Sequence, residues 1–271
     1  MGSAMAANLA KAGFAVQGYD VVPKRGSVRA ISEIDAPVVI TSLPSVQALH
    51  EVAGELAHQC VVVETSTLPI AEKEAARQSL KGEGIVLLDC PLSGTGAQAR
   101  VKDLVVYVSG DRKAYLKLKP YLPGFSRAHH YVGEFGNGSK MKFVANLMVA
   151  IHNVSAAEAF VLGMKAGLAP RDIFEVQANS AGTSRMFQVR GPMMVKGNYD
   201  DATMKNELWQ KDMKIIGEFA RQLGAPTPLF DAAGELYKAT MAQGLGLKDT
   251  AAVCAVLEKL AGLERGREKP R

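Results

Sequence analysis

The sequence lacks cysteine motifs, long apolar runs and internal repeats, and these absences narrow the class of protein. Its three cysteines stand at no metal-binding or redox spacing, at Cys60, Cys90 and Cys254. Such usage predicts a reducing compartment, here the cytoplasm, with no disulfide framework and no metal site. No stretch of 18 or more apolar residues occurs, so no membrane span is expected.

A secretory signal and a nucleic-acid partner are also disfavoured. The first residues contain no basic segment, and Lys11 interrupts any apolar core that a signal peptide would need. The formal net charge is +5, and part of that excess lies in a mixed-charge tail over 264–271 that we expect to be solvated. Mild positive charge instead suits small anionic substrates and a dinucleotide.

The first half of the chain has the pattern of a parallel sheet. Hydrophobic residues make up 48% and charged residues 22% of the 271 residues, which is a globular composition with room for two domains. Apolar runs occur at 37–42, 59–64, 84–89 and 104–109. Helical segments such as 70–81 separate them, which predicts parallel strands covered on both faces. The runs end in polar residues, where open α/β sheets bind ligands: Ser42, Glu64, Asp89 and Ser109.

The opening segment reads as part of a dinucleotide-binding unit. Residues 1–9 are mostly small and apolar, which predicts a helix. Lys11 and Gly13 are typical of a helix C-terminus, with a cation in the last turn and a glycine just beyond it. Residues 14–20 then predict a short strand ending in Asp20. Helix, glycine stop, strand and acid form the second half of a βαβ unit, and its first strand and most of its glycine-rich turn are not in the sequence. An ordinary surface helix is the alternative.

The second half predicts helices alone. No strand pattern recurs after residues 136–138, and a long helix is expected over 139–166. Further helices are expected over 170–179, 205–223, 228–243 and 249–261. We therefore predict a Rossmann-type α/β domain over 1–135 and an all-α domain over 136–271, joined by the long helix.

The long helix carries two stripes of different character. Lys142, Asn146 and Asn153 lie within about 40° of one another around a helix. Apolar residues with helical spacing run beside them, at Val144, Leu147, Met148, Ile151, Val154 and Val161. A solvent-exposed face is the simpler interpretation of the polar stripe. Amides are modest helix formers, however, so two of them indicate a hydrogen-bonding role.

Three segments at predicted strand ends are further candidates. Ser93, Gly94 and Thr95 follow the strand that ends at Asp89, and they could offer hydroxyl and backbone N–H groups to a carboxylate. A plain glycine-rich turn is the alternative. Segments 41–44 and 64–69 stand where a nicotinamide and its ribose would pass, although each could be a capped loop.

These motifs together resemble the β-hydroxyacid dehydrogenase family, which includes 3-hydroxyisobutyrate dehydrogenase and tartronate semialdehyde reductase and is similar to 6-phosphogluconate dehydrogenase. The family's catalytic motif is matched by Gly136, Gly138, Lys142 and Asn146. Residues 1–9 match the later part of its glycine-rich turn and helix, 89–94 match its substrate motif, and Lys211–Asp212 match a late Lys–Asp pair. Thr95 departs from the family's second glycine, which leaves the substrate open.

The resemblance implies an NAD(P)-dependent oxidoreductase acting on a small 3-hydroxy acid or the matching semialdehyde. Lys142 would be the general acid or base, and Asn146 would hold the substrate oxygen or orient Lys142. A lysine has an ordinary pKa of about 10.4, so it is a poor base near neutral pH unless burial or the nicotinamide cation lowers that pKa. Ser93, Gly94 and Thr95 would bind the substrate carboxylate. The cofactor residues implied are Gly2, Asp20, Leu43, Pro44, Thr67 and Lys211.

Several points stay open at this level. Asp20 favours NAD because it would accept from ribose hydroxyls, while Lys24 and Arg25 keep NADP possible. A homodimer or homotetramer is expected from the resemblance. The sequence is expected to represent a family member without its first 20 or so residues, and a non-catalytic scaffold that keeps the fold is the alternative function.

Overall fold

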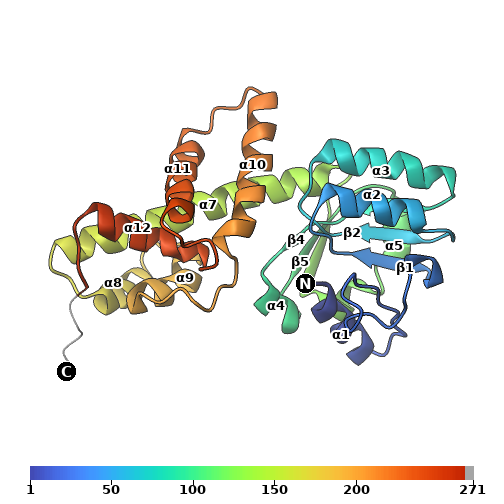
Figure 1. Ribbon diagram of the computed structural model, residues 1–271, viewed down its shortest axis with the longest axis horizontal. Coiled ribbons are helices and arrows are strands. Elements are labelled where there is room, and N and C mark those ends of the chain that lie inside the picture. Colours follow the sequence, from blue (N-terminus) through green and yellow to red (C-terminus); the bar gives the residue numbers. More distant parts are fainter. Residues whose placement is uncertain (266–271) are drawn as a thin grey trace. The chain divides into compact units, whose positions relative to one another are not determined.

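The computed structural model describes residues 1–265 and divides into two compact units, Met1–Ala145 and Asn146–Arg271 (Figure 1). From residue 266 on, the charged tail lies outside the described residues. The boundary between the units falls inside the long helix α7 (Asn137–Lys165), and we describe each unit by itself.

Two three-stranded sheets form the centre of the first unit. In one, the strands β1 (Val38–Thr41), β2 (Val61–Glu64) and β3 (Val86–Asp89) run parallel in that order. In the other, β5 (Val105–Val108) pairs with β4 (Leu92–Ser93) in antiparallel fashion and with β6 (Ala128–Tyr131) in parallel. The four predicted strands among these are confirmed, and the predicted α/β class with them.

Helices cover both faces of the β1–β2–β3 sheet. Successive side chains of a strand point to opposite faces, so each strand contributes to two separate cores. Val61 and Val63 join a core with Met5 and Leu9 of α1, whereas Val62 joins a second core with α2 and α3. In Figure 1, α2 and α3 lie side by side over the sheet. The helices of this unit are α1 (Gly2–Lys11), η1 (Ile31–Glu33), α2 (Val46–Glu55), α3 (Ile70–Gly82), α4 (Gly96–Arg100), α5 (Arg112–Leu118) and α6 (Leu122–Phe125).

The predicted strand over 14–20 is wrong. The segment has no regular structure, and no strand within residues 1–265 pairs with it. A cavity of about 320 Å³ is lined both by Val16 and Gln17 and by Val38 and Ile40 of β1. Since a strand exists only through its ladder of hydrogen bonds, this separation leaves 14–20 as an irregular stretch. The short strands β4 and β6 were not anticipated.

The second unit is helical, as predicted. It contains the later part of α7, followed by α8 (Pro170–Gln177), α9 (Arg185–Lys196), α10 (Asn206–Gln222), α11 (Pro228–Ala242), η2 (Thr250–Ala252) and α12 (Val253–Leu260). Helix α9 was missed by the sequence analysis because Gly191 and Pro192 in its middle are typical helix breakers.

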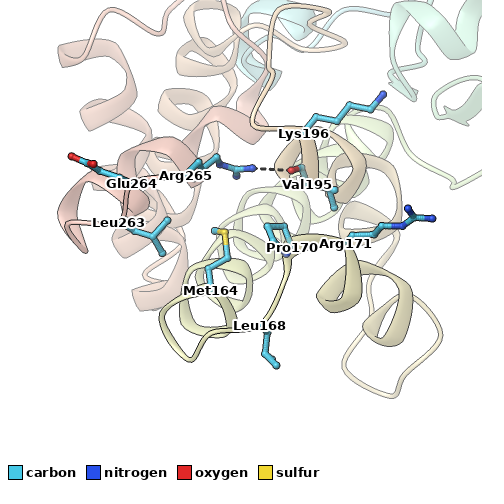
Figure 2. A pocket seen from close by; sticks show the side chains of 9 residues that line it. All are labelled: Met164, Leu168, Pro170, Arg171, Val195, Lys196, Leu263, Glu264 and Arg265. Carbon is cyan, nitrogen blue, oxygen red and sulfur yellow. Dashed lines mark hydrogen bonds between the residues drawn. The ribbon is translucent and has the colours of Figure 1, made fainter. Parts of the chain in front are cut away.

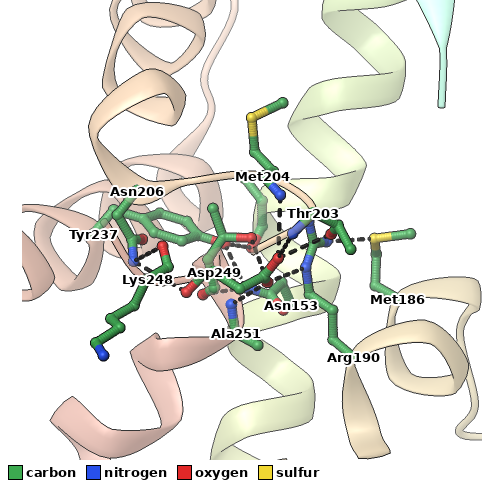
Figure 3. A network of polar contacts seen from close by, with 12 residues as sticks. Asn153, Met186, Arg190, Thr203, Met204, Asn206, Tyr237, Lys248, Asp249 and Ala251 are labelled. Atoms are coloured by element: carbon green, nitrogen blue, oxygen red, sulfur yellow. Dashed lines mark hydrogen bonds and ion pairs between the residues drawn. The ribbon is translucent and has the colours of Figure 1, made fainter. Parts of the chain in front are cut away.

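A buried carboxylate, Asp249, holds several of these helices together (Figure 3). Its oxygens accept hydrogen bonds from the guanidinium of Arg190 at 3.0 Å, from the N–H and hydroxyl of Thr203 and from the N–H groups of Met204 and Ala251. Burial alone would raise the pKa of Asp249, but Arg190 and these donors lower it below its ordinary value. The network fixes α9, the loop before α10 and η2 to one another.

In helix α7 the polar stripe is buried and part of the apolar stripe is exposed, the opposite of an ordinary amphipathic helix. Lys142, Asn146 and Asn153 of its polar stripe are buried, so the solvent-face interpretation is wrong. Val144 and Met148 of the expected apolar stripe are about half exposed instead. Burial of Asn153 is possible because its amide donates to the Tyr237 hydroxyl and to the carbonyl of Thr250.

Length and composition alone would allow α7 to cross a membrane. Within residues 1–265 no other helix meets that test. Its buried face is that of a core helix, with Ala150, Ala157 and Phe160 inaccessible to solvent. A buried core helix can have the same length and composition as a membrane-spanning helix.

Candidate active site

Charged and polar side chains gather where β2, β3 and β5 end in the first unit. Glu64 and Asp89 are the last residues of β2 and β3 and stand opposite each other in register. The ammonium of Lys73, from α3, lies 2.7 Å from a Glu64 oxygen and 2.8 Å from an Asp89 oxygen, and all three side chains are fully buried. Glu64 and Asp89, two of the four polar strand ends predicted from sequence, are therefore brought together, with a lysine that the sequence analysis did not single out.

Asp89 also receives the beginning of α7. Its carboxylate accepts from the N–H of Ser139 at 2.7 Å and from the Ser139 hydroxyl at 2.8 Å. The hydroxyl of Ser109, just beyond β5, donates to Asp89 and accepts from the N–H of Gly138. An anion at a helix N-terminus satisfies N–H groups that have no partner within the helix and interacts favourably with the helix dipole.

Gly138 makes this approach sterically possible. A Cβ at this position would lie 2.6 Å from the carbonyl oxygen of Tyr107 and 2.7 Å from that of Asp89. The first turn of α7 therefore lies directly against the strand ends, which gives a physical reason for the glycine in the Gly136–Gly138 motif.

The cluster also changes the titration of its members. Burial disfavours the ammonium of Lys73, but Asp89 and Glu64 outweigh it and raise the pKa of Lys73 above its ordinary value. Burial and the neighbouring Asp89 raise the pKa of the Cys90 thiol well above its usual range, so Cys90 is an inert core thiol.

Lys142 follows Ser139 by three residues on α7. Its side chain is buried, at 9% exposed. Asn146 follows one turn later and is buried at 5%. In the second unit, the Asn146 amide donates to the carboxylate of Asp212 at 2.8 Å, which leaves the Asn146 carbonyl oxygen for another partner. The Lys–Asp pair noted in the sequence thus includes a direct partner of Asn146.

The three predicted substrate residues lie in a turn whose shape requires glycine. Ser93 ends β4 and is partly buried. Gly94 has a φ of 132°, and a Cβ there would lie 2.7 Å from the Leu104 side chain. The N–H of Thr95 donates to the side chain of Gln98, so this N–H is already paired within the protein. The Thr95 hydroxyl oxygen accepts from the N–H of Gln98 in a capping box, which leaves its O–H to donate to a ligand.

The residues at the N-terminus of α1 fit a phosphate group. No side chain caps this helix, and no acid stands in its first turn. A Cβ on Gly2 would be in ordinary contact with the Ser42 side chain, at 3.7 Å, and would meet no other atom within 4 Å. Helix N-termini with free N–H groups and space bind phosphates. Asp20 is partly exposed, and its carboxylate accepts from the N–H of Val22 at 2.9 Å.

The remaining cofactor candidates of the first unit lie in loops after β1 and β2. The N–H of Leu43 donates to the Ser66 hydroxyl at 2.7 Å, which joins the two loops. The N–H of Ser66 in turn donates to Glu64. Pro44 is exposed and Thr67 is partly buried. The last predicted cofactor residue, Lys211, belongs to α10 in the second unit and is partly exposed.

The second unit also contains a pocket whose lining residues include none of these candidates. It has a volume of about 660 Å³ and is lined by side chains of α7, α8, α9 and the segment after α12 (Figure 2). The Arg265 guanidinium crosses one side of it and donates to the carbonyl of Val195 at 2.8 Å. None of the predicted site residues lines this pocket. Within residues 1–265, no three His, Cys, Asp or Glu side chains form a metal-binding group.

Family models match both parts of the chain. Residues 1–133 match the NAD binding domain of 6-phosphogluconate dehydrogenase. Residues 136–257 match the model described as the NAD-binding domain of NADP-dependent 3-hydroxyisobutyrate dehydrogenase.

Individual proteins agree with these matches. An L-threonate dehydrogenase of Pectobacterium atrosepticum is 30% identical over 100% of this chain and 95% of its own length. The chloroplastic glyoxylate/succinic semialdehyde reductase 2 of Arabidopsis thaliana is 34% identical over 72% of this chain. The matched region is about half (54%) of that relative's own length. The solved structure of 3-hydroxyisobutyrate dehydrogenase from Mycobacterium tuberculosis has a TM-score of 0.84, at 26% identity, over 95% of both chains. The chain therefore belongs to the β-hydroxyacid dehydrogenase family of NAD(P)-dependent oxidoreductases.

Proposed function

We propose that the protein oxidises a small 3-hydroxy acid, or reduces the matching semialdehyde, with Lys142 as general acid and base. The observation that carries the proposal is a buried lysine one turn before a buried asparagine, on a helix whose start is fixed to the strand ends. Relatives named for L-threonate and for glyoxylate and succinic semialdehyde support substrates of this size and charge.

Lys142 handles the proton of the reacting oxygen. In the reducing direction its ammonium donates a proton to the carbonyl oxygen that becomes a hydroxyl, and in the oxidising direction its amine accepts that proton. Asn146 keeps its carbonyl oxygen for a substrate hydroxyl, because its amide is held by Asp212. Ser93, Gly94 and the Thr95 hydroxyl bind the substrate carboxylate. A bound nicotinamide supplies the hydride chemistry.

The cofactor residues of the proposal are Gly2, Asp20, Leu43, Pro44, Thr67 and Lys211. Gly2 and the first turn of α1 receive the pyrophosphate, and Asp20 accepts from the adenosine ribose. A 2′-phosphate at that place would face the Asp20 carboxylate, so we propose NAD as the preferred cofactor.

The domain limits, the oligomeric state and the location of the protein belong to the same proposal. Domain limits at 1–135 and 136–271 follow the change from mixed to helical structure. A homodimer or homotetramer follows from the family, with no nucleic-acid or membrane partner. Buried free cysteines at Cys60, Cys90 and Cys254 support a cytoplasmic location.

The test is a panel of small hydroxy acids and semialdehydes assayed with NAD and NADP, with the reduced nicotinamide followed by its absorbance. We expect turnover with at least one 3-hydroxy acid or its semialdehyde, and none with hydroxy compounds that lack a carboxylate. Turnover of uncharged alcohols at equal efficiency would contradict the role given to Ser93, Gly94 and Thr95.

A further inference from the structure

The buried ion cluster of Lys73, Glu64 and Asp89 has two arms that lead to different parts of the proposed site. Glu64 and Asp89 are paired in register on adjacent strands, so two like charges would stand side by side without a cation between them. Lys73 supplies that cation, at 2.7 Å from Glu64 and 2.8 Å from Asp89. All of these groups belong to the first unit.

One arm runs from Glu64 to the loops proposed to hold the cofactor. Glu64 accepts from the N–H of Ser66 at 2.9 Å, and the Ser66 hydroxyl accepts from the N–H of Leu43 at 2.7 Å. Both Glu64 and Ser66 are buried. The carboxylate thereby fixes the loop after β2 directly and the loop after β1 through one side chain.

The other arm runs from Asp89 to the helix that carries Lys142. Asp89 accepts from the N–H and the hydroxyl of Ser139 at 2.7 and 2.8 Å. Lys142 follows three residues later, so a shift of this first turn displaces its ammonium by a similar amount. The close approach at Gly138 leaves the turn little freedom of its own.

We propose that Lys73 is a positioning residue that ties the cofactor loops, through Glu64, to the Lys142 helix, through Asp89. The inference rests on the proposed function for the meaning of Leu43, Thr67 and Lys142. A lysine that served stability alone would need no connection to either loop or helix. Here each carboxylate uses its remaining hydrogen bonds on one of the two parts.

The two arms predict different kinetic defects. Glu64→Gln places an uncharged amide opposite the Lys73 ammonium, so the loops after β1 and β2 are held less firmly. It should weaken NAD binding about tenfold, with kcat at saturating NAD nearly unchanged. Asp89→Asn should lower kcat by about 10- to 100-fold, the effect of misplacing a reacting group by about 1 Å, with NAD binding nearly unchanged. Lys73→Met should show both defects.

Leu118→Ala is the matched control. Leu118 is fully buried in the core of the same unit, in α5, and its apolar side chain cannot hydrogen-bond to either arm. Its truncation lowers the unfolding midpoint through a cavity and should leave kcat and the NAD dissociation constant unchanged. If Glu64→Gln and Asp89→Asn resemble Leu118→Ala at equal loss of midpoint, or if each shows both defects equally, the positioning role is wrong.

Two readouts separate this inference from the proposed function. Lys142→Ala is measured in parallel, and if it keeps turnover the role of Lys142 fails while the two arms can still be tested. Amide hydrogen exchange then reports the arms without any assay. Exchange at Gly138 and Ser139 should accelerate in Asp89→Asn and not in Glu64→Gln, and exchange at Leu43 and Ser66 should show the reverse. Unchanged exchange in both variants would overturn the inference.

Discussion

Lys142 is the residue whose replacement tests the proposed chemistry most directly. Lys142→Ala should lower turnover by about 10²–10⁴-fold, the usual contribution of general acid–base catalysis, and leave NAD affinity nearly intact. Steady-state kinetics together with NAD titration measures both quantities. Lys140→Ala is the control, because Lys140 is an exposed lysine on the same helix. Equal turnover in the two variants would reduce Lys142 to a structural lysine.

Asp20 is the residue proposed to favour NAD over NADP. Asp20→Ala should weaken NAD binding about tenfold and leave NADP binding unchanged or improved, because only NAD presents a 2′-hydroxyl to the carboxylate. The two dissociation constants, measured by titration, decide it. Asp35→Ala removes an exposed acid of the same unit and should change neither constant. An equal loss of both cofactors in Asp20→Ala would place Asp20 outside the ribose site.

At this scale the sequence singled out the two residues proposed to react, but not the residues that surround them. Lys142 and Asn146 stand out by spacing and by the cost of amides in a helix. Lys73 does not, because a lysine in a helix of mixed charge reads as a surface residue. Its burial depends on Glu64 and Asp89 lying side by side, and that juxtaposition comes from strand register. The apolar neighbours of Glu64 along β2 were the available signal.

Among the elements, the start of α7 is the most constrained. Gly138→Ala places a methyl group within 2.7 Å of two carbonyl oxygens, so the helix must withdraw from the strand ends. We expect a loss of about 1–3 kcal/mol in unfolding free energy and a fall in kcat, since Lys142 moves with the helix. Chemical denaturation and kinetics measure these effects.

Gly54→Ala provides the control for that substitution. Gly54 lies in α2 with nothing within 4 Å of a new Cβ. Alanine favours a helix over glycine by about 1 kcal/mol, so this variant should be as stable as the parent or more stable, with unchanged kcat. If both alanines behaved alike, the contact at Gly138 would not constrain α7.

The Asp249 network predicts how the helical unit responds to acid. Because the pKa of Asp249 is lowered in the folded state, its stabilisation is present above the unfolded pKa, near pH 4, and is lost as the pH falls through the folded value. Asp249→Asn leaves Arg190 buried without its partner and should cost about 3–5 kcal/mol near neutral pH. Denaturation followed by Trp209 fluorescence reports on this unit.

The acid dependence should flatten in Asp249→Asn, since the titrating group is gone. Glu235→Gln is the control, because Glu235 forms an exposed pair with Lys238 that contributes little. A parent-like acid transition in Asp249→Asn would assign the acid sensitivity to other carboxylates.

Helices and strands could be predicted where the local sequence has a single clear hydrophobic pattern. They could not be predicted where the structure depends on pairing with a distant segment. Continuous apolar runs gave β1, β2, β3 and β5, and long helical spacing gave α7, α10 and α11. Residues 14–20 have strand composition but no partner within residues 1–265, so no ladder forms. The polar face of α7 is buried because hydrogen-bond partners come from distant segments such as Thr250, which no local pattern reveals.

At the scale of the whole molecule, the cofactor candidates are divided between the two compact units. Gly2, Asp20, Leu43, Pro44 and Thr67 belong to the first, and Lys211 belongs to the second. The single tryptophan, Trp209, also belongs to the second unit and is buried at 2%. Its fluorescence therefore follows unfolding of the helical unit alone, and calorimetry follows the whole chain.

If Lys211 contacts the cofactor as proposed, NAD must stabilise the helical unit as well as the α/β unit. At 100 times its dissociation constant, NAD contributes about 2.7 kcal/mol to the state that binds it. We expect the Trp209 unfolding midpoint to rise with NAD, and to rise less in Lys211→Met. Lys214→Met changes an exposed lysine of the same helix and should keep the full rise. A calorimetric rise with an unmoved Trp209 midpoint would confine the cofactor to the first unit and remove Lys211 from the site.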